Sequence, residues 1–546
     1  MAVITGLSRI TGMVRTMITA AFFGTSAVGD AFVLAFRIPN LLRRLVAEGA
    51  MSSGFIPIFT EIKEKEKIPA GPAQQFFLTR ILSLTLITLS LITACGMLFS
   101  NGIVNVFYSL RAETGQAEIL LAGSLLRRMF PYLLFVSFAA VIQGVLNTYE
   151  NFTIPAAMPI LLNICIISAA GISVFAEPEA AVLRRAYFLC FGVLTGGAVQ
   201  FAAQIPWLYR HGFKIKFTIN LRDPRIKKFI FVMIPVIFST GVYQINILFI
   251  DPLALKLGDG PLSALYYSLR LQEFPLGIII VSISTVILPL FSAHTANNNH
   301  DALTRDFCRA IVLLTLLVLP ITVFSVGFRN NIIFALFASG SFNAESTALT
   351  ADCFLFHSAA ILFIGLNRVF VPLFLSHKDT RTPFIISGFG TAINICAAYC
   401  FVYFTDLGAG GLALSGLIMS ITVSAAYVIV IRKKYSVSVS DTFVKDSVKL
   451  FVAMVPSCAC LYFLSGLDIS HTVQVILVMS RQINQTSAEY SLMQLKIFEL
   501  IKIIFSAAVF LAIYGFFIKL FGVSEFQTII AAVRRRIKSF CINIKQ

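Results

Sequence analysis

Residues 8–61 read SRITGMVRTMITAAFFGTSAVGDAFVLAFRIPNLLRRLVAEGAMSSGFIPIFTE, and this stretch decides how the chain folds. It has the length and apolar content of two membrane helices, but it also carries seven charges before Glu61 at its end. They are Arg9, Arg15, Asp30, Arg37, Arg43, Arg44 and Glu48. A central arginine costs a spanning helix roughly 2.5–3.5 kcal/mol, whereas a leucine contributes only about −0.3 to −0.6 kcal/mol. Such helices persist when their charges face a bundle interior, a partner or a wet cavity.

The periodicity of the first helix predicts where its charges lie. At 100° per residue, its polar and small residues fall within an arc of roughly 120°, and apolar residues cover the rest. This arc contains Thr5, Ser8, Arg9, Gly12, Arg15, Thr16 and Thr19. In the second helix Asp30, Arg37, Arg44 and Glu48 share a stripe, although Pro39 is expected to kink it. The alternative is that the arginines reach from helix ends to lipid headgroups, and Arg43 or Arg44 fits it better than Arg15.

The composition is that of a polytopic membrane protein. The chain has 546 residues, of which 58% are hydrophobic and 13% are charged. Soluble domains carry about 25% charged residues. The net charge of +17 is explained by lysine and arginine in cytoplasmic loops and by anionic lipid beside them, which we prefer to nucleic-acid binding.

Fourteen apolar runs predict an all-α protein with about fourteen membrane spans. They cover roughly residues 2–23, 28–60, 76–99, 129–148, 155–176, 186–208, 228–250, 264–292, 308–328, 349–375, 382–404, 409–431, 446–465 and 499–521. The basic residues collect in alternate loops and in the tail, so both termini are predicted to be cytoplasmic. The loop at about 467–498 contains VQVILVMSRQINQ, a candidate interfacial helix.

Landmarks recur at offsets of 228 to 233 residues, which predicts a duplicated six-helix unit. The matching pairs are Arg37 and Arg270, Pro57 and Pro289, Pro155 and Pro383, and Asn163 and Asn394. We therefore expect two pseudo-symmetric lobes around a central cationic cavity, an N-lobe at 1–210 and a C-lobe at 211–434. Residues 435–546 would add two helices and a basic cytoplasmic tail.

The charged residues of both copies suggest an anion site. Guanidinium groups bind phosphate through two hydrogen bonds and stay charged, so several of them suit a pyrophosphate. In the second copy Arg270 lies three residues before Glu273, which equally fits a structural ion pair. Asp251 is a lone acid in an apolar helix, either an ion site or a solvated residue. His357 is more typical of a packing residue than of a proton carrier.

The sequence contains no enzyme motif. HExxH, Walker and GxSxG patterns are absent. We expect no catalytic residues, no metal site and no cofactor, with sodium or the membrane potential as the driving force.

The segments SRITGMVR, GDAFVLAFRIPNLLRRLVAEGAMSSGFIPIF and YYSLRLQEFP are similar to signature segments of the MurJ (MviN) lipid II flippases. These belong to the multidrug/oligosaccharidyl-lipid/polysaccharide exporter superfamily, and the resemblance covers nearly the whole chain. It implies a two-lobed flippase with fourteen helices. Substrate-binding residues are then expected at Arg9, Arg15, Arg43 and Arg270, and cavity acids at Asp30, Glu48 and Glu273. The sodium site of some members corresponds to Asp251 and Asn394.

Three positions depart from the family pattern. Thr16 and Leu269 replace acids that often neighbour the cavity arginines, which leaves the expected cavity more cationic. Ala398 stands where a further acid of the sodium site is expected. The start is also some ten residues shorter than is usual in the family.

The resemblance implies a lipid II flippase of the bacterial inner membrane, working by alternating access. Its partners would be lipid II, membrane lipids and other cell-wall synthesis proteins, without nucleic acid. The alternatives are a flippase for another polyprenyl-linked oligosaccharide, a drug/cation antiporter and a non-transporting scaffold for cell-wall enzymes.

Overall fold

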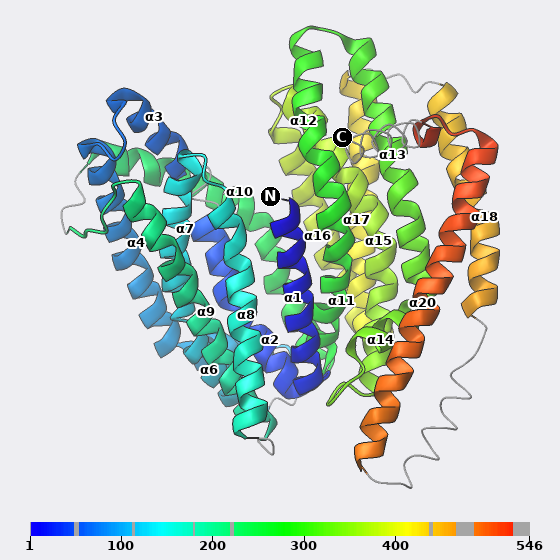
Figure 1. The fold of residues 1–546 in the computed structure, drawn as a ribbon, viewed down its shortest axis with the longest axis horizontal. Helices are drawn as coiled ribbons and strands as arrows, with labels where there is room; N and C mark the ends of the chain where they lie inside the picture. The colour runs from blue at the N-terminus through cyan, green and yellow to red at the C-terminus, as the bar shows by residue number, and fades with distance from the viewer. Residues whose placement is uncertain are drawn as a thin grey trace, which may run out of the picture. The chain divides into compact units, whose positions relative to one another are not determined.

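The computed structural model describes residues 2–48, 54–111, 115–177, 181–218, 223–435, 441–465 and 485–527. These residues form helices, and no β-strand occurs among them (Figure 1). The all-α fold class is therefore confirmed. The tail and the segment VQVILVMS, which opens the candidate interfacial helix, lie outside the described residues.

The chain forms two compact units. Unit 1 is Met1–Tyr267 with Gly340–Ser346, and unit 2 is Ser268–Ser339 with Thr347–Gln546. The domain boundaries expected at residues 210 and 434 follow from the sequence repeat. The two compact units divide the chain at other residues, so the expected boundaries stay predictions. The helix that opens the second copy of the repeat, residues 224–256, packs against the helices of unit 1.

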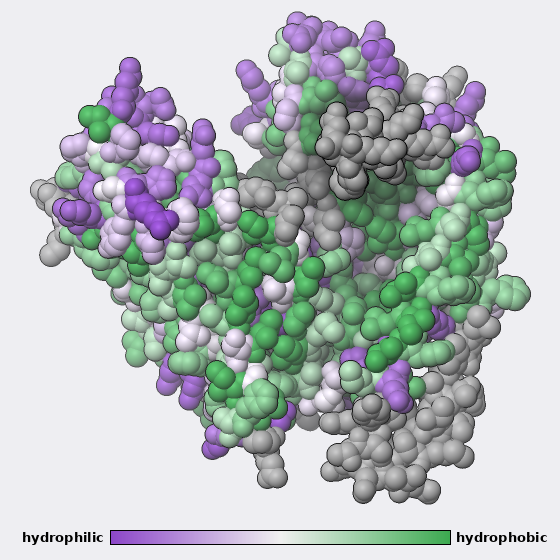
Figure 2. All heavy atoms as spheres, viewed as in Figure 1, coloured by the Kyte–Doolittle hydropathy of each residue, from purple (hydrophilic) through white to green (hydrophobic). Residues whose placement is uncertain are grey.

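Among the described residues, the following helices lie wholly in unit 1. They are α1 (Ala2–Phe23), α2 (Ala27–Leu42), the π-helix η1 (Arg43–Glu48), α3 (Ile56–Glu66), α4 (Pro72–Leu98), α5 (Ser100–Tyr108), α6 (Gln116–Met129), α7 (Tyr132–Thr148), α8 (Thr153–Ala176), α9 (Val182–Arg210) and α10 (Pro224–Lys256). On the visible face of this unit, hydrophilic residues gather around α3 and hydrophobic residues cover the helices beyond it, as expected for a protein in a bilayer (Figure 2).

Two helices begin in unit 1 and continue into unit 2: α11 (Pro261–Pro275) and α15 (Ala344–Ser376). The other helices of unit 2 are the π-helix η3 (Leu276–Ile280), α12 (Val281–Ala296), α13 (His300–Gly327), α14 (Arg329–Phe337), α16 (Arg381–Phe404), α17 (Gly408–Tyr435), α18 (Asp441–Ser465) and α20 (Gln485–Phe521). Since α20 begins at Gln485, the loop expected to reach residue 498 ends earlier.

The order of elements repeats along the chain. A shift of 229 residues carries α5 onto α14, and a shift of 228 carries α8 onto α16. The π-helices η1 and η3 begin 233 residues apart, and each follows a helix that contains a proline, Pro39 in α2 and Pro275 in α11. Pro removes a helical hydrogen bond, and π-helical turns are a recognised way to bend a helix. The structure thus reproduces the spacing of the sequence landmarks.

All fourteen expected spans overlap helices. Within the described residues ten helices are long and apolar enough to cross a membrane. The other four spans, at 2–23, 28–60, 228–250 and 264–292, are helical but fall outside those ten. Two of them contain the π-helical interruptions. The total of fourteen and the side on which each terminus lies stay predictions.

Glycine allows close contact between α8 and α9 in unit 1. A Cβ on Gly192 of α9 would lie 2.8 Å from Cβ of Ala169 on α8, and one on Gly196 would lie 2.6 Å from Cδ1 of Leu162. This four-residue spacing of small residues lets helix backbones approach each other in membranes, where packing rather than water exclusion drives association.

The turn between α1 and α2 depends on Gly24. Its φ of +56° lies in the left-handed region, and a Cβ there would lie 2.3 Å from the carbonyl oxygen of Ser341. Ser341 belongs to the 340–346 segment of unit 1, and its N–H donates to the carbonyl of Ala21 (2.8 Å). Thr25 N–H donates to Ser346 Oγ (3.2 Å).

We predict that Gly24→Ala destabilises the protein by at least about 1–2 kcal/mol, because a left-handed residue with a Cβ is strained and here also meets a backbone oxygen. Thermal unfolding of the purified protein in detergent measures the change. Gly102→Ala is the control, since a Cβ at Gly102 of α5 meets nothing within 4 Å. Equal unfolding temperatures for the two variants would contradict the role of Gly24.

Candidate functional site

The polar face predicted for α1 is buried at its second half. Arg15, Thr16 and Thr19 are buried, whereas Leu7 and Ile10 on the apolar side are about half exposed (49% and 54%). The expected separation of polar and apolar faces is therefore present in the fold.

Small and polar residues of α1 pack against α8, which lies beside it (Figure 1). Asn163 Nδ2 of α8 donates to Thr11 Oγ1 (3.2 Å) and to the Ser8 carbonyl (3.4 Å). A Cβ at Gly12 would lie 3.4 Å from the same amide nitrogen. Asn163, which the sequence marked only through the repeat, thus holds α1 in place.

Arg15 is held by aromatic residues of unit 1. Its Nη2 donates to the hydroxyl of Tyr266 on α11 (3.3 Å), and its guanidinium lies 5.4 Å from the ring centroid of Phe36 on α2. A cation is attracted to the face of an aromatic ring, and the attraction grows when both are shielded from water. These contacts stabilise a charge inside an apolar helix.

Arg37 of α2 forms an ion pair with Asp251 of α10. The Asp251 side chain is 2% exposed and that of Arg37 is 16% exposed. The Arg37 guanidinium also lies 5.6 Å from the centroid of the Tyr266 ring. We call Arg15, Arg37, Asp251 and Tyr266 the arginine cluster. The sequence analysis missed Tyr266, although it lies in the quoted segment YYSLRLQEFP.

Asp30, expected from the family resemblance to be a cavity acid, has a structural role that the sequence did not predict. This buried carboxylate accepts hydrogen bonds from Gly260 N (2.7 Å), Ser263 N (2.7 Å) and Ser263 Oγ (2.5 Å). Free N–H groups at a helix start need such an acceptor. Asp30 therefore caps α11 from a neighbouring helix.

Arg9 and Arg43 are partly buried residues of the same unit. Arg9 is half-buried, six residues before Arg15 and therefore about 9 Å away along the axis of α1. Arg43 is half-buried in η1, and its Nε donates to Asn40 Oδ1 (3.1 Å). The backbone of Glu48 ends η1, and its side chain lies outside the description.

In unit 2, Arg270 and Glu273 form the ion pair that their spacing allows, with Nη1 and Oε2 2.8 Å apart and side chains 30% and 41% exposed. His357 of α15 is buried and contacts two residues of α11. Its Nδ1 lies 2.8 Å from Ser268 Oγ, and its carbonyl accepts a hydrogen bond from Gln272 Nε2 (2.6 Å). These contacts fit the packing role expected for His357.

The proposed ion residues lie in different units. Asp251 belongs to unit 1, and Asn394 is buried in α16 of unit 2. Arg37 pairs with one carboxylate oxygen of Asp251, Oδ1. Within the described residues, no group of three or more His, Cys, Asp or Glu side chains could hold a metal ion. The coupling ion stays a prediction.

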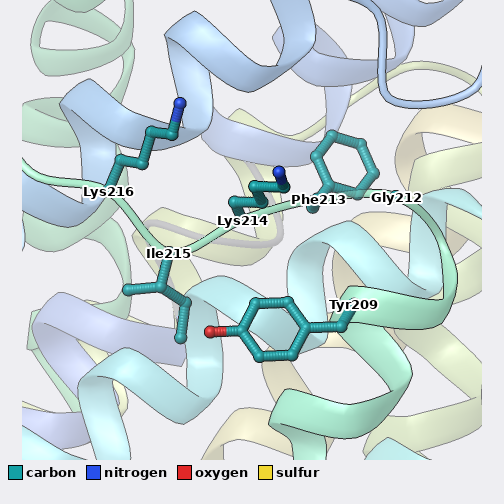
Figure 3. Close-up of a pocket in the computed structure, with 6 residues that line it drawn as sticks. All are labelled: Tyr209, Gly212, Phe213, Lys214, Ile215 and Lys216. Carbon is teal, nitrogen blue, oxygen red and sulfur yellow. The ribbon is translucent and has the colours of Figure 1, made fainter.

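A shallow hollow of about 450 Å³ occurs where the chain leaves α9. Its lining consists of Tyr209, Gly212, Phe213, Lys214, Ile215 and Lys216, and the two lysines project to one side of the extended segment (Figure 3). None of the residues predicted for the site lines this hollow. It is therefore separate from the arginine cluster.

Comparison with known proteins gives consistent matches. Residues 19–481 match the family described as Lipid II flippase MurJ. A probable lipid II flippase MurJ of Treponema pallidum is 30% identical over 85% of this chain and 88% of its own length. The lipid II flippase MurJ of Burkholderia cenocepacia is 34% identical over 75% of this chain and 78% of its own.

Solved structures share the fold. A lipid II flippase MurJ in an inward closed conformation superposes with a TM-score of 0.70 at 22% identity, covering 94% of this chain and 98% of that one. An inward-facing multidrug MATE transporter of the MOP superfamily has a TM-score of 0.65 at 16% identity, covering 80% and 95%.

We predict that Asp30→Ala destabilises the protein by about 2–4 kcal/mol, because it leaves two buried N–H groups at the start of α11 without an acceptor. Asp30→Asn keeps one acceptor oxygen and should lie between Asp30→Ala and the wild type. Thermal unfolding in detergent measures both, with the half-exposed Glu273→Ala as the control. A loss of transport at unchanged stability would instead support the cavity role expected from the sequence.

Proposed function

Because the chain belongs to the MurJ family of lipid II flippases, we propose that it moves lipid II from the inner to the outer leaflet of the bacterial cytoplasmic membrane. The relatives named lipid II flippases match more than three quarters of their own length, which supports extending their activity to the whole of this chain.

One observation carries the proposal: cations lie within the apolar helices of unit 1. Arg15 is buried, and Arg9 and Arg43 are half-buried. Arginine in a membrane helix is expensive, and such residues usually mark a substrate or ion pathway. A guanidinium group matches the oxygens of a phosphate bidentately. The arrangement favours a substrate with a strongly anionic headgroup, such as the pyrophosphate of lipid II.

We propose that Arg9, Arg15, Arg43 and Arg270 bind the headgroup, while the polyprenyl tail stays in the bilayer. Access alternates between the two leaflets during the cycle. Glu273 pairs with Arg270 in the absence of substrate and exchanges this arginine for the phosphate when substrate binds. Glu48 is proposed as a second cavity acid.

The proposed activity is transport without covalent chemistry, so it needs no catalytic residue. Its driving force would be sodium or the membrane potential. We also propose that the protein has partners besides lipid II and membrane lipids, such as enzymes of cell-wall synthesis.

The rival functions lead to different observations. A drug/cation antiporter should have more acids than arginines in its site, whereas here the arginines outnumber the acids. A flippase for another polyprenyl-linked oligosaccharide would share the cationic site. Rescue of a strain depleted of its own lipid II flippase separates that alternative from ours, because only a lipid II flippase restores growth.

We predict that Arg15→Ala and Arg270→Ala each lower lipid II flipping at least about tenfold, since each removes a charged hydrogen-bond donor to phosphate. Exposure of lipid II on the outer leaflet of depleted cells measures flipping. The controls are Arg184→Ala and Arg309→Ala, which remove arginines with 64% and 67% exposed side chains. Normal flipping by both site variants would sink the arginine assignment, whereas failure of the wild type to flip lipid II in these cells would favour a non-transporting scaffold.

A further inference from the structure

Among the side chains that the structure describes, unit 1 contains three buried acids, and one of them differs from the others. Asp30 accepts three hydrogen bonds from the start of α11. Asp223 accepts from Arg80 Nη1 (2.7 Å), Arg225 N (2.8 Å) and Arg225 Nε (3.3 Å). Asp251 accepts one hydrogen bond, from Arg37, and its buried Oδ2 has no hydrogen-bond partner among the described residues.

A buried ion pair that serves only stability is usually completed by further hydrogen bonds, because each unpaired polar atom adds a desolvation cost. The Asp223 carboxylate follows that rule at both oxygens, although the Nε atom of its partner Arg80 is buried without a hydrogen-bond partner among the described residues. The Asp251 site does not, although both carboxylates are equally buried, with 2% and 3% of the side chain exposed. The incomplete bonding of Asp251 therefore needs an explanation other than stability.

The arginine of this pair has donors to spare. A guanidinium carries five N–H groups, and Nη1 is the one atom of Arg37 that donates to another described residue. The Arg37 side chain is also 16% exposed, so it is accessible. Arg37 can hold Asp251 with one nitrogen and offer the rest of its fork to an anion.

Tyr266 joins Arg37 to the proposed headgroup site. Its hydroxyl accepts from Arg15, and its ring lies beside the Arg37 guanidinium. One side chain therefore contacts both cations. Arg37 therefore offers a second guanidinium group to an anion that Arg15 binds in the same cluster.

We infer that Arg37 is a further binding residue for the diphosphate of the substrate, and that Asp251 is a positioning residue that lowers the affinity of Arg37 for the diphosphate. This inference rests on the proposed function. The negative charge of Asp251 orients Arg37 and offsets part of its attraction for phosphate. A transporter needs such moderation, because a site that binds too tightly does not release its substrate.

The two partners should therefore change substrate affinity in opposite directions. Arg37→Gln should weaken the binding of lipid II at least about tenfold, since a charged donor to phosphate is lost. Asp251→Asn should tighten it about threefold to tenfold, because the opposing charge disappears while a hydrogen-bond acceptor for Arg37 remains. Flipping should fall in both variants. Titration of lipid II into the purified full-length protein in nanodiscs measures the affinities.

Arg80→Gln and Asp223→Asn are matched controls, since they alter a buried ion pair of the same unit outside the arginine cluster. They should lower the unfolding temperature and leave lipid II affinity unchanged. Weaker binding in both Arg37→Gln and Asp251→Asn, or unchanged binding in either, overturns the inference. The pair would then have a structural role only.

A second probe and a second variant keep the outcomes separate. Undecaprenyl diphosphate carries the diphosphate without the sugar and peptide. If the wild type binds this probe but not lipid II, the proposed function is contradicted. The affinities of the Arg37 and Asp251 variants are then measured with undecaprenyl diphosphate instead of lipid II. If Asp251→Asn does not fold, the double variant Arg37→Gln/Asp251→Asn removes both charges together. It must bind more weakly than the wild type, and equal binding overturns the inference.

Discussion

The carboxylate of Asp30 fixes the start of α11, and the geometry of unit 1 depends on this contact. Its three hydrogen bonds hold Gly260 and Ser263 against α2. The next turn of α11 then presents two tyrosines. Tyr267 donates to the carbonyl of Gly24 (3.1 Å), and Tyr266 accepts from Arg15. One buried acid thereby stabilises the α1–α2 turn and positions the aromatic residue at the centre of the arginine cluster.

The protein stabilises its intramembrane cations in ways that leave them able to bind. The faces of Phe36 and Tyr266 attract a guanidinium without using its N–H groups. The carboxylate of Asp251 uses one donor of Arg37. A cation that was fully hydrogen-bonded inside the protein would be stable but of little use to a substrate. In the proposed mechanism, the single hydrogen bond between Arg37 and Asp251 links the fold of unit 1 to an anionic headgroup.

The duplication shows how one sequence position can have two structural solutions. Arg37 and Arg270 are equivalent in the repeat, and each is followed by a proline and a π-helix. Arg37 pairs with Asp251 on another helix, whereas Arg270 pairs with Glu273 one turn along its own helix. The two copies therefore keep the same helix architecture and surround equivalent arginines with different partners.

The sequence by itself determined the helices, the polar face of α1, the repeat and the family, because these follow from local periodicity, composition and short motifs. It located Arg15 and Asp251 as unusual residues, but it did not predict what they contact. Tertiary structure decided that Asp30 caps a helix, that Arg37 pairs with Asp251, and that Tyr266 joins the two arginines. These partners lie 233, 214 and 251 residues apart. Periodicity shows which face of a helix is polar, and only packing brings a particular partner to that face.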